Sequence, residues 1–521
     1  MVVHHAGNPA DMESSLKRSR TIYAPRIYQN AWPSRPRRTQ RTAEIHLSTG
    51  LPGFQVVGLS DTECRAMRGR IRSAIISSHL KWPDYHITVN LAPAESLEQG
   101  TRYDLPVALG LLIASQQLPE AIADHREFFG ELGLDGSIRR CRGLLSAVAA
   151  ATQVGCACGV AIEGASELAS IAHSRIIAAP DLLSLCGQLQ QSNPTLTVPS
   201  QSHDGTPITY PDLSSIRGQP LLCRALEMAA AGGHHLLISG PPGIGKTLAA
   251  SVLPGLLPPI TPAQRREVSL LRDLAGLPLC EGPPFRAPHH SSSIAALMGG
   301  TSRAIPGEIS MAHAGVLFLD ELAEFPRAVL NQLRQPLEMG EITVARAAHQ
   351  HTYPAQFQLV AAMNPCPCGM TGRTDSTCRC TPVAIQRYWH GVSGPLLDRI
   401  DLHITIDRPP PDALLSKRPS KEYSKTVRER VIKLRERQFF RQDCLNSALE
   451  GDQLISACGL APKTQTWFVS AIKALSLSAR SAHRRLRVAR TLADLGDHDT
   501  VSIAHLETAL SFREIDSQPA A

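Results

Sequence analysis

A glycine-rich segment near the middle of the chain has the residue types and spacing of a phosphate-binding loop. It follows the pattern GxxxxGK[ST] and consists of Gly240, Pro241, Pro242, Gly243, Ile244, Gly245, Lys246 and Thr247. The glycines allow backbone N–H groups to turn toward a phosphate, Lys246 can reach the β- and γ-phosphates, and Thr247 can hold Mg²⁺. The segment therefore predicts binding of ATP with Mg²⁺. The alternative is a Gly/Pro turn before an ordinary helix.

Two adjacent carboxylates, Asp320 and Glu321, follow the apolar run 316–319. Such a run predicts a buried parallel strand whose carboxyl end would deliver both acids to a ligand crevice. We expect Asp320 to hold Mg²⁺ together with Thr247, and Glu321 to orient and activate the water that attacks the γ-phosphate. Together with the phosphate loop, these acids predict hydrolysis of a nucleoside triphosphate.

An insertion over residues 366–380 contains two close pairs of cysteines. The first pair is Cys366 and Cys368, and the second is Cys378 and Cys380. Four thiolates can close a tetrahedral Zn²⁺ site, so we expect structural zinc, with free thiols as the alternative. The pair His289 and His290 could also suggest a metal site. Because no third ligand is near it in sequence, we favour a structural or nucleotide-proximal role for this pair.

The elements that would position these residues alternate between strands and helices. An apolar run at 236–238 precedes the phosphate loop, and an apolar helical segment at 248–253 follows it. Another apolar run, 357–363, predicts a buried strand that ends at Asn364. This alternation is typical of an α/β fold with a parallel sheet.

Composition narrows the functional class only moderately. The formal net charge of +7 permits a nucleic-acid partner, and aromatic residues make up only 4% of the chain, which argues against extensive base stacking. No apolar run approaches the ~20 residues needed to span a bilayer, and the Arg37-Arg38 pair has no apolar segment after it. We therefore expect no membrane partner and a cytoplasmic location.

The chain divides into segments by composition and pattern. Residues 1–42 are basic and aperiodic, which predicts a disordered arm that either touches nucleic-acid phosphates or has no function. Residues 43–190 predict an α+β domain, and the polar segment 191–212 predicts a linker. The ATPase core is expected over 213–407, followed by helices over 408–521.

Several runs resemble the ComM/YifB family, the magnesium-chelatase-like ATPases linked to DNA uptake and recombination. The resemblance covers about residues 43–515, and the runs that carry it outside the phosphate loop are LSTGLPGFQVVGLSD, ITVNLAPAE, RYDLP and GELGLDGSIRR. It implies a Lon-protease-like α+β amino-terminal domain, an AAA+ core and a small α-helical lid. Members of this family open with an extra apolar strand, whereas this chain begins with the basic arm, so we expect that strand to be altered or lost.

The Lon likeness does not bring peptidase activity with it. In Lon proteases, a serine after a proline and a lysine after a GGL turn form the catalytic dyad. The matching positions here are Val107 and Arg142, so the nucleophile and the titratable amine are both absent.

The resemblance also assigns further residues of the nucleotide site. Asn364 matches the sensor position that helps to place the lytic water, and Arg399 matches the arginine finger that reaches into a neighbouring subunit. Arg480 matches the second sensor and is expected to contact the γ-phosphate, with Arg484 and Arg487 as substitutes. A finger of this kind requires a homo-oligomer, and the family implies a ring of six.

A strongly charged helix is predicted over residues 421–442. Its basic residues are Lys421, Lys425, Arg428, Arg430, Lys433, Arg435, Arg437 and Arg441. Either a solvated face or a DNA-contacting face would explain this pattern.

We expect an AAA+ ring motor of the ComM type that couples ATP hydrolysis to helicase or branch-migration activity on DNA, during recombination of incoming DNA in natural transformation. The family, rather than the residues, supplies the link to DNA. One alternative is a magnesium-chelatase-like motor that remodels a protein partner. Another is a nucleotide-binding scaffold without motor activity, and an ATP-dependent protease ranks below both because the dyad is missing.

Overall fold

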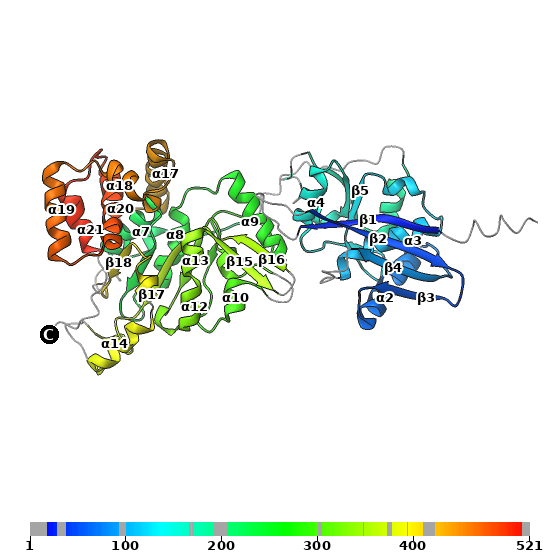
Figure 1. Cartoon of the computed structure of the whole chain (residues 1–521), viewed down its shortest axis with the longest axis horizontal. Helices are drawn as coiled ribbons and strands as arrows, with labels where there is room; N and C mark the ends of the chain where they lie inside the picture. Colours follow the sequence, from blue (N-terminus) through cyan, green and yellow to red (C-terminus); the bar gives the residue numbers. More distant parts are fainter. Residues whose placement is uncertain are drawn as a thin grey trace, which may run out of the picture.

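The computed structural model describes residues 18–28, 38–92, 100–165, 168, 171, 173–191, 206–300, 305–346, 349–371, 378–392, 394–409 and 422–512. Figure 1 shows an elongated molecule, with an amino-terminal unit at one end, a central unit, and a group of carboxyl-terminal helices at the other end. Among the described residues, no helix is both long enough and apolar enough to cross a bilayer.

The amino-terminal unit is built on a four-stranded sheet in the order β1-β2-β4-β3. These strands are β1 (Arg18–Tyr28), β2 (Arg38–Ser48), β3 (Gly53–Val57) and β4 (His86–Ala92). Helices α2 (Asp61–Ser77) and α3 (Asp104–Ala114) contribute buried apolar residues to the same core as β2 and β4. The unit also contains helix α4 (Leu144–Gln153) and a parallel sheet in the order β5-β8-β9, formed by β5 (Arg126–Phe129), β8 (Ala157–Ala161) and β9 (Arg175–Ala179).

The prediction that residues 1–42 form a disordered arm is wrong for residues 18–28 and 38–42. β1 pairs antiparallel with β2 over almost its whole length, with an irregularity between Ala24 and Ile27. The unit therefore has an edge strand before β2, where we expected the start of the chain to be altered or the first strand to be lost. The pairing joins backbone N–H and C=O groups, and a side-chain pattern does not reveal it. Residues 1–17 and 29–37 lie outside the described residues.

The two positions that match the Lon dyad have other surroundings here. Val107 is fully buried within α3. Arg142 is exposed and lies beside Gly276, the C-cap residue of helix α9 (Pro262–Ala275). Neither residue offers a nucleophile or a titratable amine.

The central unit has a five-stranded parallel sheet in the order β13-β14-β17-β11-β18. The strands are β11 (Leu236–Ser239), β13 (Phe285–Arg286), β14 (Val316–Leu319), β17 (Gln358–Met363) and β18 (Leu402–Thr405). β11, β14 and β17 are fully buried, as their apolar runs predicted. The first strand in sequence, β11, lies between the last two, so the carboxyl ends of β11, β14 and β17 meet at one edge of the sheet.

The carboxyl-terminal helices share a hydrophobic core with the central unit. They are α17 (Ser424–Gln442), α18 (Gly451–Cys458), α19 (Pro462–Ala474), α20 (Ala479–Leu495) and α21 (Ile503–Ser511). Buried side chains of α17 and α20 belong to the same cluster as those of α7 (Pro220–Gly232) and α8 (Lys246–Leu256).

The arginines of α17 make contacts within the chain. Arg428 donates to Gly255 O, Arg430 pairs with Glu227 and Glu422, and Arg435 donates to Ala230 O. Arg437 and Arg441 pair with carboxylates near the end of α20. Each of these five arginines therefore bonds a group at least 53 residues away in the chain, which the pattern of the helix alone does not reveal.

One helix joins the amino-terminal unit to the central unit. α9 (Pro262–Ala275) carries Asp273, whose side chain is fully buried. Asp273 accepts hydrogen bonds from Arg140 at 2.9 Å and from the backbone N–H of Leu145, in the first turn of α4, at 2.8 Å. A carboxylate of the central unit thus caps a helix of the amino-terminal unit.

Candidate active site

The phosphate loop connects β11 to α8 at the carboxyl edge of the sheet. Gly243 has φ 77° and Gly245 has φ 90°, a backbone conformation that favours glycine. Gly240 has no room for a side chain, since a Cβ there would lie 2.6 Å from Ile406 O. These glycines therefore allow the backbone to adopt the conformation of the loop, and they carry no side chain that could cover its N–H groups. The sequence pattern predicted this role.

Lys246 and Asn364 converge over this loop. Lys246 Nζ donates to Asn364 Oδ1 at 2.8 Å and to Gly240 O at 2.5 Å. Burial lowers the pKa of Lys246, and Asp320 and Glu321 oppose that shift. Asn364 follows β17, so the structure brings the predicted sensor to the predicted phosphate-binding lysine.

The side chains of Thr247 and Asp320 meet at the start of α8. Thr247 Oγ1 donates to Asp320 Oδ2 at 2.8 Å. A hydroxyl and a carboxylate oxygen are ligands that Mg²⁺ prefers, and Mg²⁺ completes its shell with waters and nucleotide phosphates. This donor set fits the predicted magnesium ion.

Glu321 stands just beyond β14 with a strained backbone. Its φ is 52°, and a non-glycine residue in this region is uncommon and often functional. Its Oε2 lies 3.2 Å from Nδ1 of His290, while His289 contacts Ser291. The histidine pair thus lies beside Glu321, the acid expected to activate water. Among the described residues, the only cluster that could hold a metal ion is that of the four cysteines, and it does not include the histidines. The sequence suggested a structural or nucleotide-proximal role for the pair but gave no sign of the contact between His290 and Glu321.

Arg399 lies away from the phosphate loop of its own chain. It precedes β18, and the amino-terminal ends of parallel strands lie at the edge opposite the carboxyl ends. There it lines an open groove of about 1080 Å³ together with Glu338 and Arg480. A residue at this edge cannot complete the nucleotide site of its own subunit.

Arg480, the residue expected to contact the γ-phosphate, shares that location and lies with Arg399 and Glu338. It lies in the first turn of α20 and pairs with Glu338 at 3.2 Å. The substitutes also have other partners: Arg484 donates to Leu397 O and Ile400 O, and Arg487 donates to Leu449 O. The sequence identified the helix, but the direction from which it approaches the sheet depends on packing against α7.

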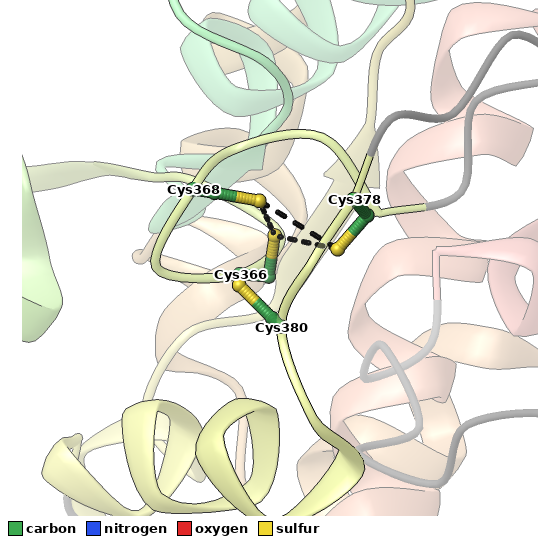
Figure 2. Close-up of side chains that lie close together, drawn as sticks. All are labelled: Cys366, Cys368, Cys378 and Cys380. Atoms are coloured by element: carbon green, nitrogen blue, oxygen red, sulfur yellow. Dashed lines mark hydrogen bonds between the residues drawn. The ribbon is translucent and has the colours of Figure 1, made fainter.

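The four insertion cysteines converge after β17 (Figure 2). Their sulfur atoms all lie within 4.8 Å of one another. The Cys366–Cys368, Cys366–Cys378 and Cys368–Cys378 sulfur distances are 3.3, 3.8 and 3.6 Å. In a tetrahedral site with Zn–S bonds of about 2.3 Å, the sulfurs are about 3.8 Å apart. The donor set and its spacing therefore fit Zn²⁺. Residues 372–377, within the insertion, lie outside the described residues.

Comparison with known proteins covers most of the chain. The model of the magnesium chelatase subunit ChlI matches residues 212–414, a second ChlI model matches residues 43–162, and the ChlI carboxyl-terminal model matches residues 421–513. The uncharacterized protein YifB of Salmonella typhimurium is 43% identical over 480 residues, which cover 91% of this chain and 94% of the relative.

Two further relatives bear on the family and the fold. The competence protein ComM of Haemophilus influenzae is 42% identical over 480 residues, covering 91% of this chain and 94% of its own. Lon protease 2 of Bacillus subtilis is 24% identical over 184 residues, covering 29% of this chain and 32% of its own. The parallel sheet with its phosphate loop is the ATPase core that the sequence predicted. The chain therefore belongs to the ComM/YifB family of magnesium-chelatase-like AAA+ ATPases.

Proposed function

We propose that the protein is a ring motor in which each ATP is hydrolysed between two subunits. One observation carries this proposal: the phosphate loop and Arg399 lie at opposite edges of the same parallel sheet. A head-to-tail arrangement brings one edge of a subunit against the other edge of its neighbour, and such contacts close into rings. A ring of six is the assembly we propose.

Within the shared site, each residue has a separate role. The backbone of 240–245 and Lys246 hold the phosphates, and Thr247 and Asp320 hold Mg²⁺, which neutralises charge on the β- and γ-phosphates. Glu321 and Asn364 place the attacking water, and Arg399 of the neighbour stabilises the charge of the transition state. Arg480, which lies at the same edge as Arg399, would act on the neighbour's nucleotide as well.

We further propose that the motor works on branched or single-stranded DNA, as a helicase or branch-migration factor in recombination of incoming DNA. Support comes from the Haemophilus relative, whose name is competence protein, and from the net charge of +7. Because the charged helix α17 uses five of its arginines within the fold, we place the DNA contacts on other surfaces.

The test is ATP turnover of the purified protein with no DNA and with single-stranded, linear duplex, forked and four-way DNA, followed by strand displacement on the best substrate. We expect forked or four-way DNA to stimulate turnover, and Glu321→Gln to abolish both turnover and displacement. If no DNA stimulates turnover and none binds at low salt, the DNA part of the proposal is wrong.

A motor that remodels a protein partner is the second candidate, because the matching family models are those of a magnesium chelatase subunit. It predicts turnover that a partner protein stimulates and DNA does not. ATP-driven metal insertion, measured with a chelatase partner and a tetrapyrrole, would distinguish it from the DNA motor.

We also propose that the cysteine insertion holds structural zinc. Cys366 is two residues from Asn364, and Gly369 packs against Pro242 of the phosphate loop, so an ordered insertion would support the nucleotide site. Metal analysis of the purified protein should find about one zinc ion per chain. Cys368→Ser with Cys378→Ser should remove it, and zinc retained by this double variant would contradict the assignment.

A further inference from the structure

Glu338 binds two arginines that come from distant parts of the chain. It lies near the end of α13 (Arg334–Met339) and pairs through Oε1 with Arg399 and, at 3.2 Å, with Arg480. Burial acts to raise the pKa of Glu338, but the hydrogen bonds and charges of the two arginines lower it overall. One ionised carboxylate therefore serves two guanidinium groups.

Arg399 is withdrawn into the subunit in this arrangement. Its side chain is only 9% exposed, and besides Glu338 it contacts the carbonyl oxygen of Pro395. Its Nε is buried and has no hydrogen-bond partner in the described part of the chain. A guanidinium that acts on a neighbouring subunit must reach outward, so Arg399 is here in a conformation that is incompatible with its proposed role.

Glu338 itself stands at the surface of the groove. Its side chain is 50% exposed and that of Arg480 is 54% exposed, so both face the space into which a neighbour would bring its nucleotide. Arginine binds phosphate and carboxylate groups with the same planar set of donors. A triphosphate carries more charge than one carboxylate and can therefore compete with Glu338 for both arginines.

We propose that Glu338 covers Arg399 and Arg480 in an isolated subunit and gives them up to the nucleotide phosphates of a second copy of this chain. This inference rests on the proposed shared site. It makes each subunit inactive until a neighbour with bound nucleotide takes the arginines from Glu338, so ring closure and hydrolysis become linked.

The first test measures the exposure of Arg399 directly, without reference to hydrolysis. The protein is labelled with phenylglyoxal at low concentration without nucleotide, and the labelled arginines are identified by peptide mass spectrometry. Glu338→Gln removes the charge of the carboxylate, and losing a charge-assisted hydrogen bond should speed labelling of Arg399 by about tenfold.

Glu341→Gln is the matched control, because Glu341 is an exposed carboxylate three residues away. It should leave the labelling rate at the wild-type value. Glu338→Ala serves as a second variant and should behave as Glu338→Gln does. If Arg399 is labelled equally fast in the wild type and in both Glu338 variants, Glu338 does not cover it and the proposal is wrong.

The second test measures turnover per subunit against protein concentration. The wild type should need a higher concentration for half-maximal turnover than Glu338→Gln, by several fold, while Glu341→Gln should match the wild type. If Glu338→Gln instead falls to the rate of Arg399→Ala, Glu338 positions the arginines in the working site and does not restrain them, which would overturn the proposal. If wild-type turnover is independent of protein concentration and Arg399→Ala remains active, the proposal of a site shared between subunits is wrong. The labelling experiment still decides whether Glu338 covers Arg399.

Discussion

At the scale of single residues, the nucleotide site is built from short-range motifs that the sequence shows directly. The phosphate loop and the pair Asp320 and Glu321 were predictable, because each motif includes the strand that positions it. The contact between Glu321 and His290 was not, since the two residues come from different strand ends. Local patterns identified these chemical groups and the pairing of Asp320 with Thr247, whereas the contact of His290 with Glu321 depends on the fold.

Lys246 provides the simplest test at this scale. Lys246→Ala removes the charged group closest to the expected phosphates, so the Kd for ATP should rise by about 10- to 100-fold. Titration with a fluorescent ATP analogue measures this. Lys473→Ala, which changes an exposed lysine on α19, is the control and should bind as the wild type does. Unchanged affinity in Lys246→Ala would refute the assigned role of the loop.

At the scale of secondary-structure elements, the sequence pattern did not predict the contacts of two segments, β1 and helix α17. Residues 18–28 belong to the basic, aperiodic segment 1–42 that predicted disorder, yet they form β1 because β2 offers a free backbone edge. The arginines of α17 give a pattern typical of a solvated or DNA-contacting helix, yet their partners lie on α7, α8 and the end of α20. β1 pairs with residues 10 to 29 positions away, and these arginines bond groups 53 to 205 positions away, so neither pairing leaves a periodic signal within its own segment.

Asp494 shows how these pairings hold the carboxyl-terminal helices together. Its buried carboxylate accepts hydrogen bonds from Arg441, Asn446 and Arg490, and the Arg490 side chain is fully buried. Asp494→Ala would leave the charge of Arg490 without a counter-ion, which should lower the free energy of unfolding by about 3 to 5 kcal/mol. Urea denaturation followed by circular dichroism would show this as a lower midpoint.

The same carboxylate predicts a pH dependence. Burial acts to raise the pKa of Asp494, but the hydrogen bonds from Arg441 and Asn446 and the charges of Arg490 and Arg441 lower it overall. Because its folded pKa lies below the unfolded value of about 3.9, its stabilising contribution is present above about pH 4 and is lost as pH falls through the folded pKa. The stability difference between wild type and Asp494→Asn should therefore shrink below pH 4. A difference that stays constant to pH 3 would contradict this account.

At the scale of the whole molecule, Asp273 connects the amino-terminal unit to the ATPase core. Asp273→Asn weakens the charged contacts to Arg140 and to the first turn of α4, which should destabilise the joint by about 1 to 3 kcal/mol. Limited proteolysis should then cut between the two units faster than in the wild type. Asp124→Asn, at an exposed position in the amino-terminal unit, should not change the cleavage rate. Equal cleavage of wild type and Asp273→Asn would show that the joint does not depend on this carboxylate.

The central claim also belongs to this scale, because it concerns two subunits. The sequence motifs suggested a shared site through resemblance, and the fold supplies a physical reason in the opposite positions of Arg399 and the phosphate loop. That claim predicts that Glu321→Gln and Arg399→Ala are each inactive alone and that mixing them restores turnover. In a mixed ring, an Arg399→Ala subunit keeps its own Glu321 and receives an intact Arg399 from a Glu321→Gln neighbour.

The most direct measurement is therefore ATP turnover of the two variants alone and mixed in equal amounts, with subunit exchange allowed before the assay. Random assembly makes about a quarter of the sites complete, so we expect turnover of up to about a quarter of the wild-type rate in the mixture. The control is a mixture of two other proteins, the double variant that carries both Glu321→Gln and Arg399→Ala and the single variant Glu321→Gln. None of the rings in this mixture contains a complete site. Turnover by Arg399→Ala alone at the wild-type rate, or a mixture that exchanges subunits and stays inactive, would contradict the shared site.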